Sequence, residues 1–126
     1  MRAIPNMTVI TVADAVETKK AVFAIAEHQG PVYLRLSRAA APVFYPEDMK
    51  FEIGRGITVR EGGDVTIITT GTVLHKALAA AELLEEKGIQ ARVVDMHTIK
   101  PIDEELIIEC ARETGAIVTV EEHSVY

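Results

Sequence analysis

The stretch from Gly63 to Met96 constrains the fold most, because it passes from a strand pattern to a helix pattern and back within about thirty-five residues. Residues 65–69 form a β-branched run without charge, which is typical of a strand buried on both faces of a parallel sheet. Apolar residues then recur at helical spacing, and Gly88 is placed for a left-handed C-cap. Residues 91–95 resume the strand pattern. The stretch predicts a βαβ unit with parallel strands and a right-handed crossover.

A first strand–helix–strand piece precedes this unit. The pattern predicts strands over residues 8–12 and 32–36 and a helix over residues 15–28. Asp14 and Glu17 have the D-x-x-E spacing of a capping box at the start of that helix. The apolar residues expected on its buried face are Val16, Ala21, Val22, Phe23, Ile25 and Ala26. Two strands and one helix cannot bury a sheet on both faces, so this piece needs further chain to pack against.

The segments on either side of the βαβ unit predict a further edge strand and a further helix. Residues 57–60 are separated from the strand at 65–69 by a glycine-containing connection, which predicts a hairpin and one antiparallel edge strand. Residues 97–101 have the composition of a short crossing loop. A third helix should begin near Asp103, and residues 116–120 are expected to form one more buried strand.

Together these elements predict an α/β fold, a mostly parallel sheet with crossover helices and one antiparallel edge strand. Between Ser37 and Gly56 the periodicity disappears, and the alanines, prolines and glycines there are typical of a linker that runs over a surface. We therefore expect a first unit over residues 1–38, a linker over residues 39–54 and a second unit over residues 55–126.

Composition excludes several classes of function. The chain has 126 residues, 48% of them apolar and 25% charged, which is ordinary for a soluble globular protein. A formal charge of -6 with dispersed basic residues disfavours nucleic acid as a partner. No apolar run is long enough to cross a bilayer and no signal peptide is recognisable, so we expect a cytoplasmic protein without a membrane partner. The single cysteine, Cys110, excludes an internal disulfide and is expected to be buried as a small apolar residue.

The histidines do not form a recognisable site. His28, His75, His97 and His123 have no metal-binding spacing, and solvated or helix-capping imidazoles are the simplest interpretation of all four histidines. His97 and His123 follow the C-terminal ends of strands, where open α/β sheets bind ligands, so their role stays open. The turn at residues 70–72 could present helix N-terminal N–H groups to an anion, although no glycine-rich phosphate loop is present.

Two carboxylate and arginine patterns have simple structural explanations. Asp103, Glu104 and Glu105 fall in the first turn of the third helix, where capping and the helix dipole account for them. Strand alternation sends Arg35 into one face of its sheet, whereas Arg38 falls just past the strand end and is free to meet an anion. From the residue pattern alone, an exposed surface arginine is the favoured interpretation of Arg38.

Several segments resemble the C-terminal half of transketolase, specifically the short split or archaeal type. These segments are RAIPNMTVITVADAVETKKAV, GPVYLRLSR, IKPID and VEEHSVY, and they keep the order and spacing of that family over nearly the whole chain. The resemblance implies that residues 1–38 end a pyrimidine-binding domain and that residues 55–126 form a truncated C-terminal domain. Val12 departs from the family pattern, which usually has proline there.

The resemblance implies an enzyme that transfers a two-carbon ketol unit between sugar phosphates, with thiamine diphosphate and Mg²⁺ as cofactors. It implies no catalytic, cofactor-binding or metal-binding residue in this chain, which would be inactive alone. The expected partners are the N-terminal transketolase domains or subunit, and a second copy in a homodimer. Arg38 matches the arginine that binds the phosphate of the sugar, a role that suits the two-pronged hydrogen bonding of a guanidinium.

Two alternatives remain open. The chain could belong to a related thiamine enzyme, such as the β subunit of a 2-oxoacid dehydrogenase or deoxyxylulose-phosphate synthase, because these enzymes share the C-terminal domain. It could also be a non-catalytic α/β assembly module built on the βαβ unit.

Overall fold

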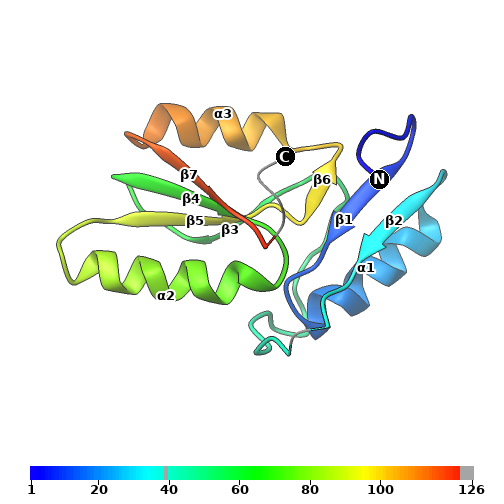
Figure 1. The fold of residues 1–126 in the computed structure, drawn as a ribbon, viewed down its shortest axis with the longest axis horizontal. Coiled ribbons are helices and arrows are strands. Elements are labelled where there is room, and N and C mark those ends of the chain that lie inside the picture. Colours follow the sequence, from blue (N-terminus) through cyan, green and yellow to red (C-terminus); the bar gives the residue numbers. More distant parts are fainter. Residues whose placement is uncertain (39, 123–126) are drawn as a thin grey trace.

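The computed structural model describes residues 1–38 and 40–122, which form two sheets with helices packed against them (Figure 1). The elements in chain order are β1 (Thr8–Thr11), α1 (Ala15–Glu27), β2 (Val32–Arg35), β3 (Ile57–Arg60), β4 (Val65–Thr69), the 3₁₀ turn η1 (Gly71–Val73), α2 (Leu74–Glu85), β5 (Ala91–Asp95), β6 (Thr98–Lys100), α3 (Glu104–Glu113) and β7 (Ile117–Val120). The strand orders are β2-β1-β6 and β3-β5-β4-β7. The predicted α/β class is confirmed.

The larger sheet contains the predicted βαβ unit. Strands β4 and β5 are parallel, and β7 joins the other side of β4, also parallel. Successive residues of a strand face opposite sides, so Ile67 packs with α2 while Ile68 packs with α3. The helices lie on opposite faces of the sheet (Figure 1). Burial on both faces explains the uncharged run in β4, and Cys110 of α3 is fully buried as predicted.

The predicted hairpin between β3 and β4 is wrong. Strand β3 is an antiparallel edge strand, but it pairs with β5, with Ile57 opposite Asp95. The connection from β3 to β4 therefore crosses the start of β5. Gly62 makes this crossing possible, because a Cβ atom at that position would lie 2.3 Å from the carbonyl carbon of Ala91. Gly62 thus permits a close backbone crossing where the sequence suggested a tight turn.

The crossing loop predicted at residues 97–101 is also wrong. Residues 98–100 form β6, which pairs antiparallel with β1, with Ile10 opposite Thr98. The smaller sheet, in which β1 and β2 are parallel, thus takes its third strand from a distant part of the chain. Lys100 secures this strand by donating to the carbonyl oxygens of Arg2 and Ile4. A strand of three residues is too short to show a period in the sequence.

The buried face predicted for α1 is partly wrong. Val16 and Ala21 are buried, but Val22 and Phe23 are 50% and 65% exposed, and Ala26 is exposed. The helix contacts the rest of the described chain through a narrow stripe, and Glu17 occupies a fully buried position within that stripe. Apolar residues beside the stripe therefore face outward.

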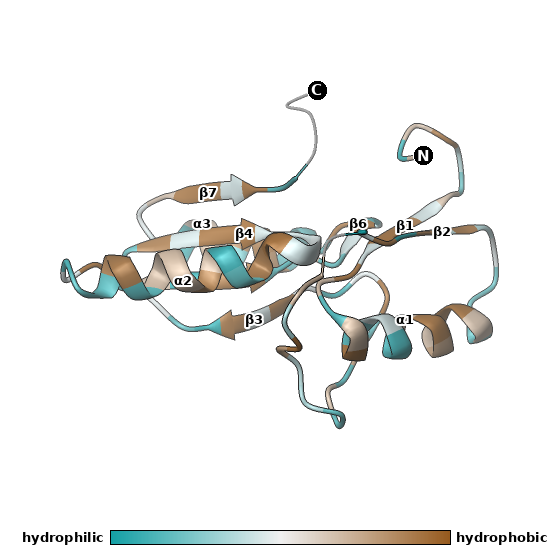
Figure 2. Cartoon of the chain, turned by 60° about the horizontal axis from the view of Figure 1, so that its bottom comes forward, coloured by the Kyte–Doolittle hydropathy of each residue, from teal (hydrophilic) through white to brown (hydrophobic). Residues whose placement is uncertain are grey.

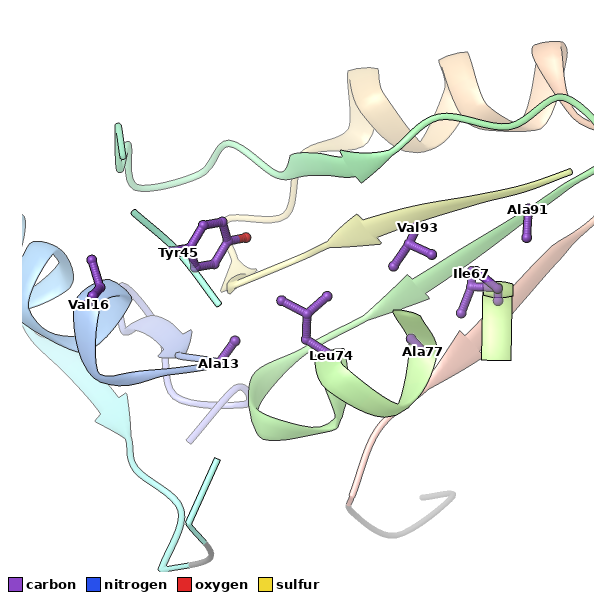
Figure 3. Packing of buried hydrophobic residues seen from close by; sticks show 9 residues of the cluster. Ala13, Val16, Tyr45, Ile67, Leu74, Ala77, Ala91 and Val93 are labelled. Carbon is purple, nitrogen blue, oxygen red and sulfur yellow. The ribbon is translucent and has the colours of Figure 1, made fainter. Parts of the chain in front are cut away.

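The segment between β2 and β3 does not run only over the surface, as the linker interpretation expected. Tyr45 is buried in the largest hydrophobic cluster, together with Ala13 and Val16 from α1 and its approach and Leu74 from α2 (Figure 3). This cluster joins the first strand–helix–strand piece to the larger sheet. The core is therefore continuous across the junction between the two sheets.

The strand at the C-terminal end is less buried than expected. Val118 of β7 is 50% exposed, because β7 is an edge strand of the larger sheet. Figure 2 shows hydrophobic residues on β7 and β4 and along much of α2. No helix in the described part of the chain is long and apolar enough to cross a membrane.

Candidate functional site

A cavity of about 340 Å³ opens where β1 and β2 end and α1 begins. It is lined by Val12, Ala13, Asp14, Ala15, Thr18, Leu36, Ser37, Ala41 and Thr72. All of these except Thr72 come from residues 12–41, and Thr72 follows β4 of the larger sheet. The cavity therefore lies at the carboxyl ends of parallel strands, which is where open α/β sheets bind their ligands.

Arg38 lies next to this cavity. It directly follows Ser37, which lines the cavity, and its side chain is exposed. None of the ion pairs found among the described residues involves Arg38. Arg38 itself does not line the cavity, and its side chain is exposed to solvent. An exposed arginine favours an anionic ligand, whereas the N-terminus of α1 is already capped by the carboxylate of Asp14.

Arg35 has a different environment. Its Nη2 lies 2.9 Å from Oε1 of Glu122, which follows β7. The hydroxyl of Thr72 lies 3.4 Å from the other oxygen of Glu122. This carboxylate therefore stands beside the turn at residues 70–72, which forms the short 3₁₀ turn η1. The sequence suggested an anion at that turn, but a negative charge already occupies this place.

The prediction of a solvated or capping imidazole is wrong for His97. Its side chain is fully buried and stacks on Phe51, with ring centroids 4.2 Å apart. Nδ1 is hydrogen-bonded to the hydroxyl of Thr98 at 2.9 Å. Burial lowers the pKa of His97 to about 4, so the ring is neutral at physiological pH. His97 occupies the junction between β5 and β6 and does not face the cavity.

The other histidines remain without an assigned role. Nε2 of His28 lies 3.3 Å from the hydroxyl of Thr8, and Nδ1 of His75 lies 2.5 Å from the carbonyl oxygen of Thr72. Both imidazoles are partly exposed, which agrees with the simple interpretation of these residues. His123 lies outside the described residues.

Asp103 has the capping role that the sequence predicted. Its Oδ1 accepts a hydrogen bond from the N–H of Leu106 at 3.1 Å, and its Oδ2 accepts one from the N–H of Gly56 at 3.0 Å. In the described part of the chain, no three His, Cys, Asp or Glu side chains are grouped so that they could hold a metal ion.

A buried acidic cluster lies behind the cavity, and sequence reasoning missed it. Glu17 and Asp95 are fully buried, and the hydroxyl of Tyr45 donates to Oδ2 of Asp95 at 2.8 Å. Asp14 accepts from the backbone N–H groups of Glu17, Phe44 and Tyr45 at 2.7–2.8 Å. The helix cap predicted for Asp14 is confirmed. Only the D-x-x-E spacing marked Glu17 in the sequence. It predicted that Glu17 accepts from a backbone N–H, as it does from Ala13, but it did not indicate the contact with the buried cluster.

The buried cluster changes the protonation of Glu17. Burial, followed by the charge of Asp95, raises the pKa of Glu17 to about 9. Burial is also the main cause that raises the pKa of Asp95 and of the Tyr45 hydroxyl above their ordinary values. Glu17 therefore carries a proton at neutral pH.

Comparison with known families identifies both parts of this arrangement. The family model described as the transketolase pyrimidine binding domain matches residues 1–43, and the one described as the transketolase C-terminal domain matches residues 54–126. The chain belongs to the transketolase family. Its sequence and fold are those of the C-terminal part of a split transketolase.

Individual relatives agree with the family match. The chain is 46% identical to an apulose-4-phosphate transketolase subunit of Phocaeicola vulgatus, with 98% of this chain and 40% of the relative covered. It is 48% identical to a putative transketolase C-terminal section of Methanocaldococcus jannaschii, with 99% of this chain and 39% of the relative covered. The chain thus spans about 40% of the length of these curated relatives.

Solved transketolase structures have the same fold. A split-gene transketolase described as an inactive β4 tetramer is 54% identical and superposes with a TM-score of 0.97, with 99% of this chain and 42% of that chain covered. A transketolase mutant from Pichia stipitis is 27% identical with a TM-score of 0.77, with 99% and 19% covered. Both sheets of the present structure therefore match a known transketolase arrangement.

Proposed function

We propose that this chain is the C-terminal part of an enzyme that transfers a two-carbon ketol unit between sugar phosphates. The observation that carries the proposal is the transketolase match over both segments of the chain, with an exposed arginine beside a cavity at the strand ends. In this proposal a separate N-terminal section holds thiamine diphosphate and Mg²⁺, and this chain has no activity alone. The described residues offer no cluster of metal ligands, so we assign no step of the reaction to them.

We propose that Arg38 binds the anionic end of the sugar. A guanidinium presents two parallel N–H donors to two oxygens of a tetrahedral anion. The names of two relatives support an anionic substrate: one is an apulose-4-phosphate transketolase subunit, and another is a 6-deoxy-6-sulfo-D-fructose transketolase subunit. Phosphate and sulfonate groups both offer the oxygens that an arginine fork requires.

The remaining parts of the proposal concern organisation. We propose that the chain acts as a homodimer through its C-terminal domain, together with the N-terminal section, and that it is cytoplasmic. We also keep the proposed division into residues 1–38, a linker at 39–54 and residues 55–126. Hydrogen bonds between β1 and β6 cross that division.

Replacing Arg38 tests the binding role. Arg38→Ala in the full-length protein, assembled with its N-terminal section, thiamine diphosphate and Mg²⁺, should raise KM for a phosphorylated ketose about 10- to 100-fold, because charge-assisted hydrogen bonds are worth about 1.5–3 kcal/mol. KM for an unphosphorylated ketose should not change. Arg112→Ala, which removes an exposed arginine from α3, is the matched control and should leave both constants unchanged. An unchanged KM for the phosphorylated ketose would refute this role of Arg38.

The choice of substrate tests the reaction itself. The assembled wild-type enzyme should form a new sugar phosphate from a ketose phosphate donor and an aldose phosphate acceptor. Release of CO₂ from a 2-oxoacid, without ketol transfer, would instead favour a related thiamine enzyme. A folded, cofactor-loaded assembly with neither activity would favour a non-catalytic module.

A further inference from the structure

The acidic cluster behind the cavity places two carboxyl groups against each other. Glu17 comes from the first turn of α1 and Asp95 from the end of β5. Among the described residues, Oε1 of Glu17 and Oδ1 of Asp95 are both buried without a hydrogen-bond partner, and the charge of Asp95 acts on Glu17. Both are fully buried. Figure 3 shows Tyr45 with Ala13 and Val16, which belong to the same hydrophobic cluster. A hydrogen bond between two carboxyl groups requires a proton on one of them.

The hydrogen bonds decide which group carries that proton. Asp95 accepts from the hydroxyl of Tyr45 at 2.8 Å, a donor that favours its charged form. Glu17 accepts through Oε2 from the backbone N–H of Ala13 at 2.5 Å, while its Oε1 has no hydrogen-bond partner in the described part of the chain. A proton on Oε1 of Glu17, donated to Oδ1 of Asp95, would satisfy both of these buried oxygens.

We propose that Glu17 is a positioning residue that carries a proton at neutral pH and donates it to Asp95, and that this hydrogen bond holds the turn beside Arg38 in its binding geometry. The shared proton concerns the fold alone. The positioning of the turn beside Arg38 rests on the proposed function of the cavity.

Hydrogen bonds of Ala13 and Asp14 connect Glu17 to the cavity. Ala13, which donates to Glu17, lines the cavity, as does Asp14. Asp14 in turn binds the N–H groups of Phe44 and Tyr45, which fixes the end of the segment that begins at Arg38. Glu17 thus holds the turn at the cavity, and Asp14 holds the chain at Phe44 and Tyr45. The bond from Glu17 to Asp95 attaches this assembly to the larger sheet.

The groups that face Glu17 explain why it must be neutral. Asp14 faces it from the start of α1, Asp95 from β5, and the Tyr45 hydroxyl from the segment between β2 and β3. The two carboxylates repel a third negative charge, and burial disfavours it further. If Glu17 loses its proton, two charged carboxylates come into contact without water, so the bond to Asp95 breaks.

The sign of the resulting pH dependence follows from the pKa values. The pKa of Glu17 is raised from 4.5 to about 9, so the folded protein holds a proton that the unfolded chain releases. Its stabilising effect is complete below about pH 4.5 and is lost as the pH rises toward 9. His97 acts in the opposite direction, because its lowered pKa of about 4 affects stability only between pH 4 and 6.5. Measurements between pH 7.5 and about 9 therefore isolate the acidic pair.

Urea unfolding of the full-length protein at several pH values tests the shared proton. The unfolding equilibrium constant of the wild type should rise by up to tenfold per pH unit above pH 7.5, relative to the Glu17→Gln variant. The glutamine amide can accept from Ala13 and donate to Asp95, so this variant should fold and lack that slope. Glu82→Gln, at an exposed position on α2, should keep the wild-type slope. Equal slopes in the wild type and Glu17→Gln would overturn the proposal.

Direct detection of the proton provides a second measurement. Carboxyl ¹³C NMR of glutamate-labelled protein should show one glutamate that is protonated at pH 7.5, and its signal should be missing in Glu17→Gln. A Glu17 signal in the carboxylate form at this pH would refute the shared proton even if a variant fails to fold.

The positioning role has its own readout in the assembled enzyme. KM for the phosphorylated ketose should rise several-fold in the wild type as the pH approaches 9 but stay lower in Glu17→Gln, whereas Glu17→Ala should have a raised KM already at pH 7.5. Parallel pH profiles in the wild type and Glu17→Gln would refute the positioning role. If Arg38→Ala has no effect on KM, the proposed function of the cavity fails, while the unfolding and NMR results still decide whether the proton is shared.

Discussion

Whether a glycine in the connection from β3 to β4 can be replaced depends on how closely a neighbouring strand passes it. Gly62 and Gly63 are neighbours in the connection from β3 to β4, yet only Gly62 lies against the start of β5. A Cβ atom at Gly62 would meet the backbone of Ala91 and Arg92 at 2.3–2.4 Å, whereas one at Gly63 would meet nothing within 4 Å. Backbone atoms paired in a sheet cannot move aside as a flexible side chain can. The requirement for glycine is therefore specific to Gly62.

Alanine substitutions at the two glycines test this difference. Gly62→Ala should lower the free energy of unfolding by about 1–3 kcal/mol, the usual cost of forcing extra atoms into a packed site. Gly63→Ala should change the free energy of unfolding by less than about 1 kcal/mol. Urea unfolding measures both. Equal losses at the two positions would contradict the crossing of the chain over β5.

Helix α1 buries a charged residue type and exposes several apolar side chains. The helix buries Val16, Glu17 and Ala21 while it exposes Phe23 and Ala26. An apolar pattern around more than half of a helix predicts a broader buried face than the described contacts provide. A buried glutamate is tolerated in the stripe because its Oε2 accepts from the N–H of Ala13 and because burial raises its pKa to about 9, which keeps it uncharged at neutral pH.

Matched substitutions on α1 test the position of the buried stripe. Ala21→Glu places a carboxylate at a position with no exposure. It should lower the free energy of unfolding by several kcal/mol, because the carboxylate would be buried in a hydrophobic cluster. Ala26→Glu makes the same chemical change at an exposed position, and its effect should stay below roughly 0.5 kcal/mol. Thermal or urea unfolding distinguishes them. A larger loss for Ala26→Glu would place the stripe on the other side of the helix.

The whole molecule is held together by contacts that join its two sheets. Strand β6 follows β5 of the larger sheet along the chain but hydrogen-bonds to β1 of the smaller sheet. The main hydrophobic cluster includes Val16 from the first segment and Leu74 and Val93 from the second, with Tyr45 between them (Figure 3). The segments matched by the two family models therefore share one core, and the smaller sheet takes its third strand, β6, from the second segment.

This shared core predicts a single unfolding transition. In hydrogen exchange with mass spectrometry at increasing urea, peptides that contain β1 and peptides that contain β5 should lose protection at the same urea concentration. A variant with Thr98→Pro, which removes a donor from β6, should shift both sets of peptides together to a lower concentration. Loss of protection in β1 well before β5 would mean that the two segments are independent units.

The sequence by itself determined the features that repeat over short distances. The βαβ unit, its left-handed Gly88 and the helix caps at Asp14 and Asp103 follow from local spacing, because strand and helix periods and cap geometry involve residues close in the chain. The family resemblance came from motifs of the same local kind. The role of Arg38 stays a prediction that rests on such a motif.

Only the tertiary structure decided which strands pair and which polar groups become buried. The pairing of β3 with β5, the joining of β6 to β1, the stacking of His97 on Phe51 and the contact of Glu17 with Asp95 all link residues far apart in sequence. No local period encodes such a partner. Burial and the charges around a group, and therefore its protonation, are set by those distant neighbours.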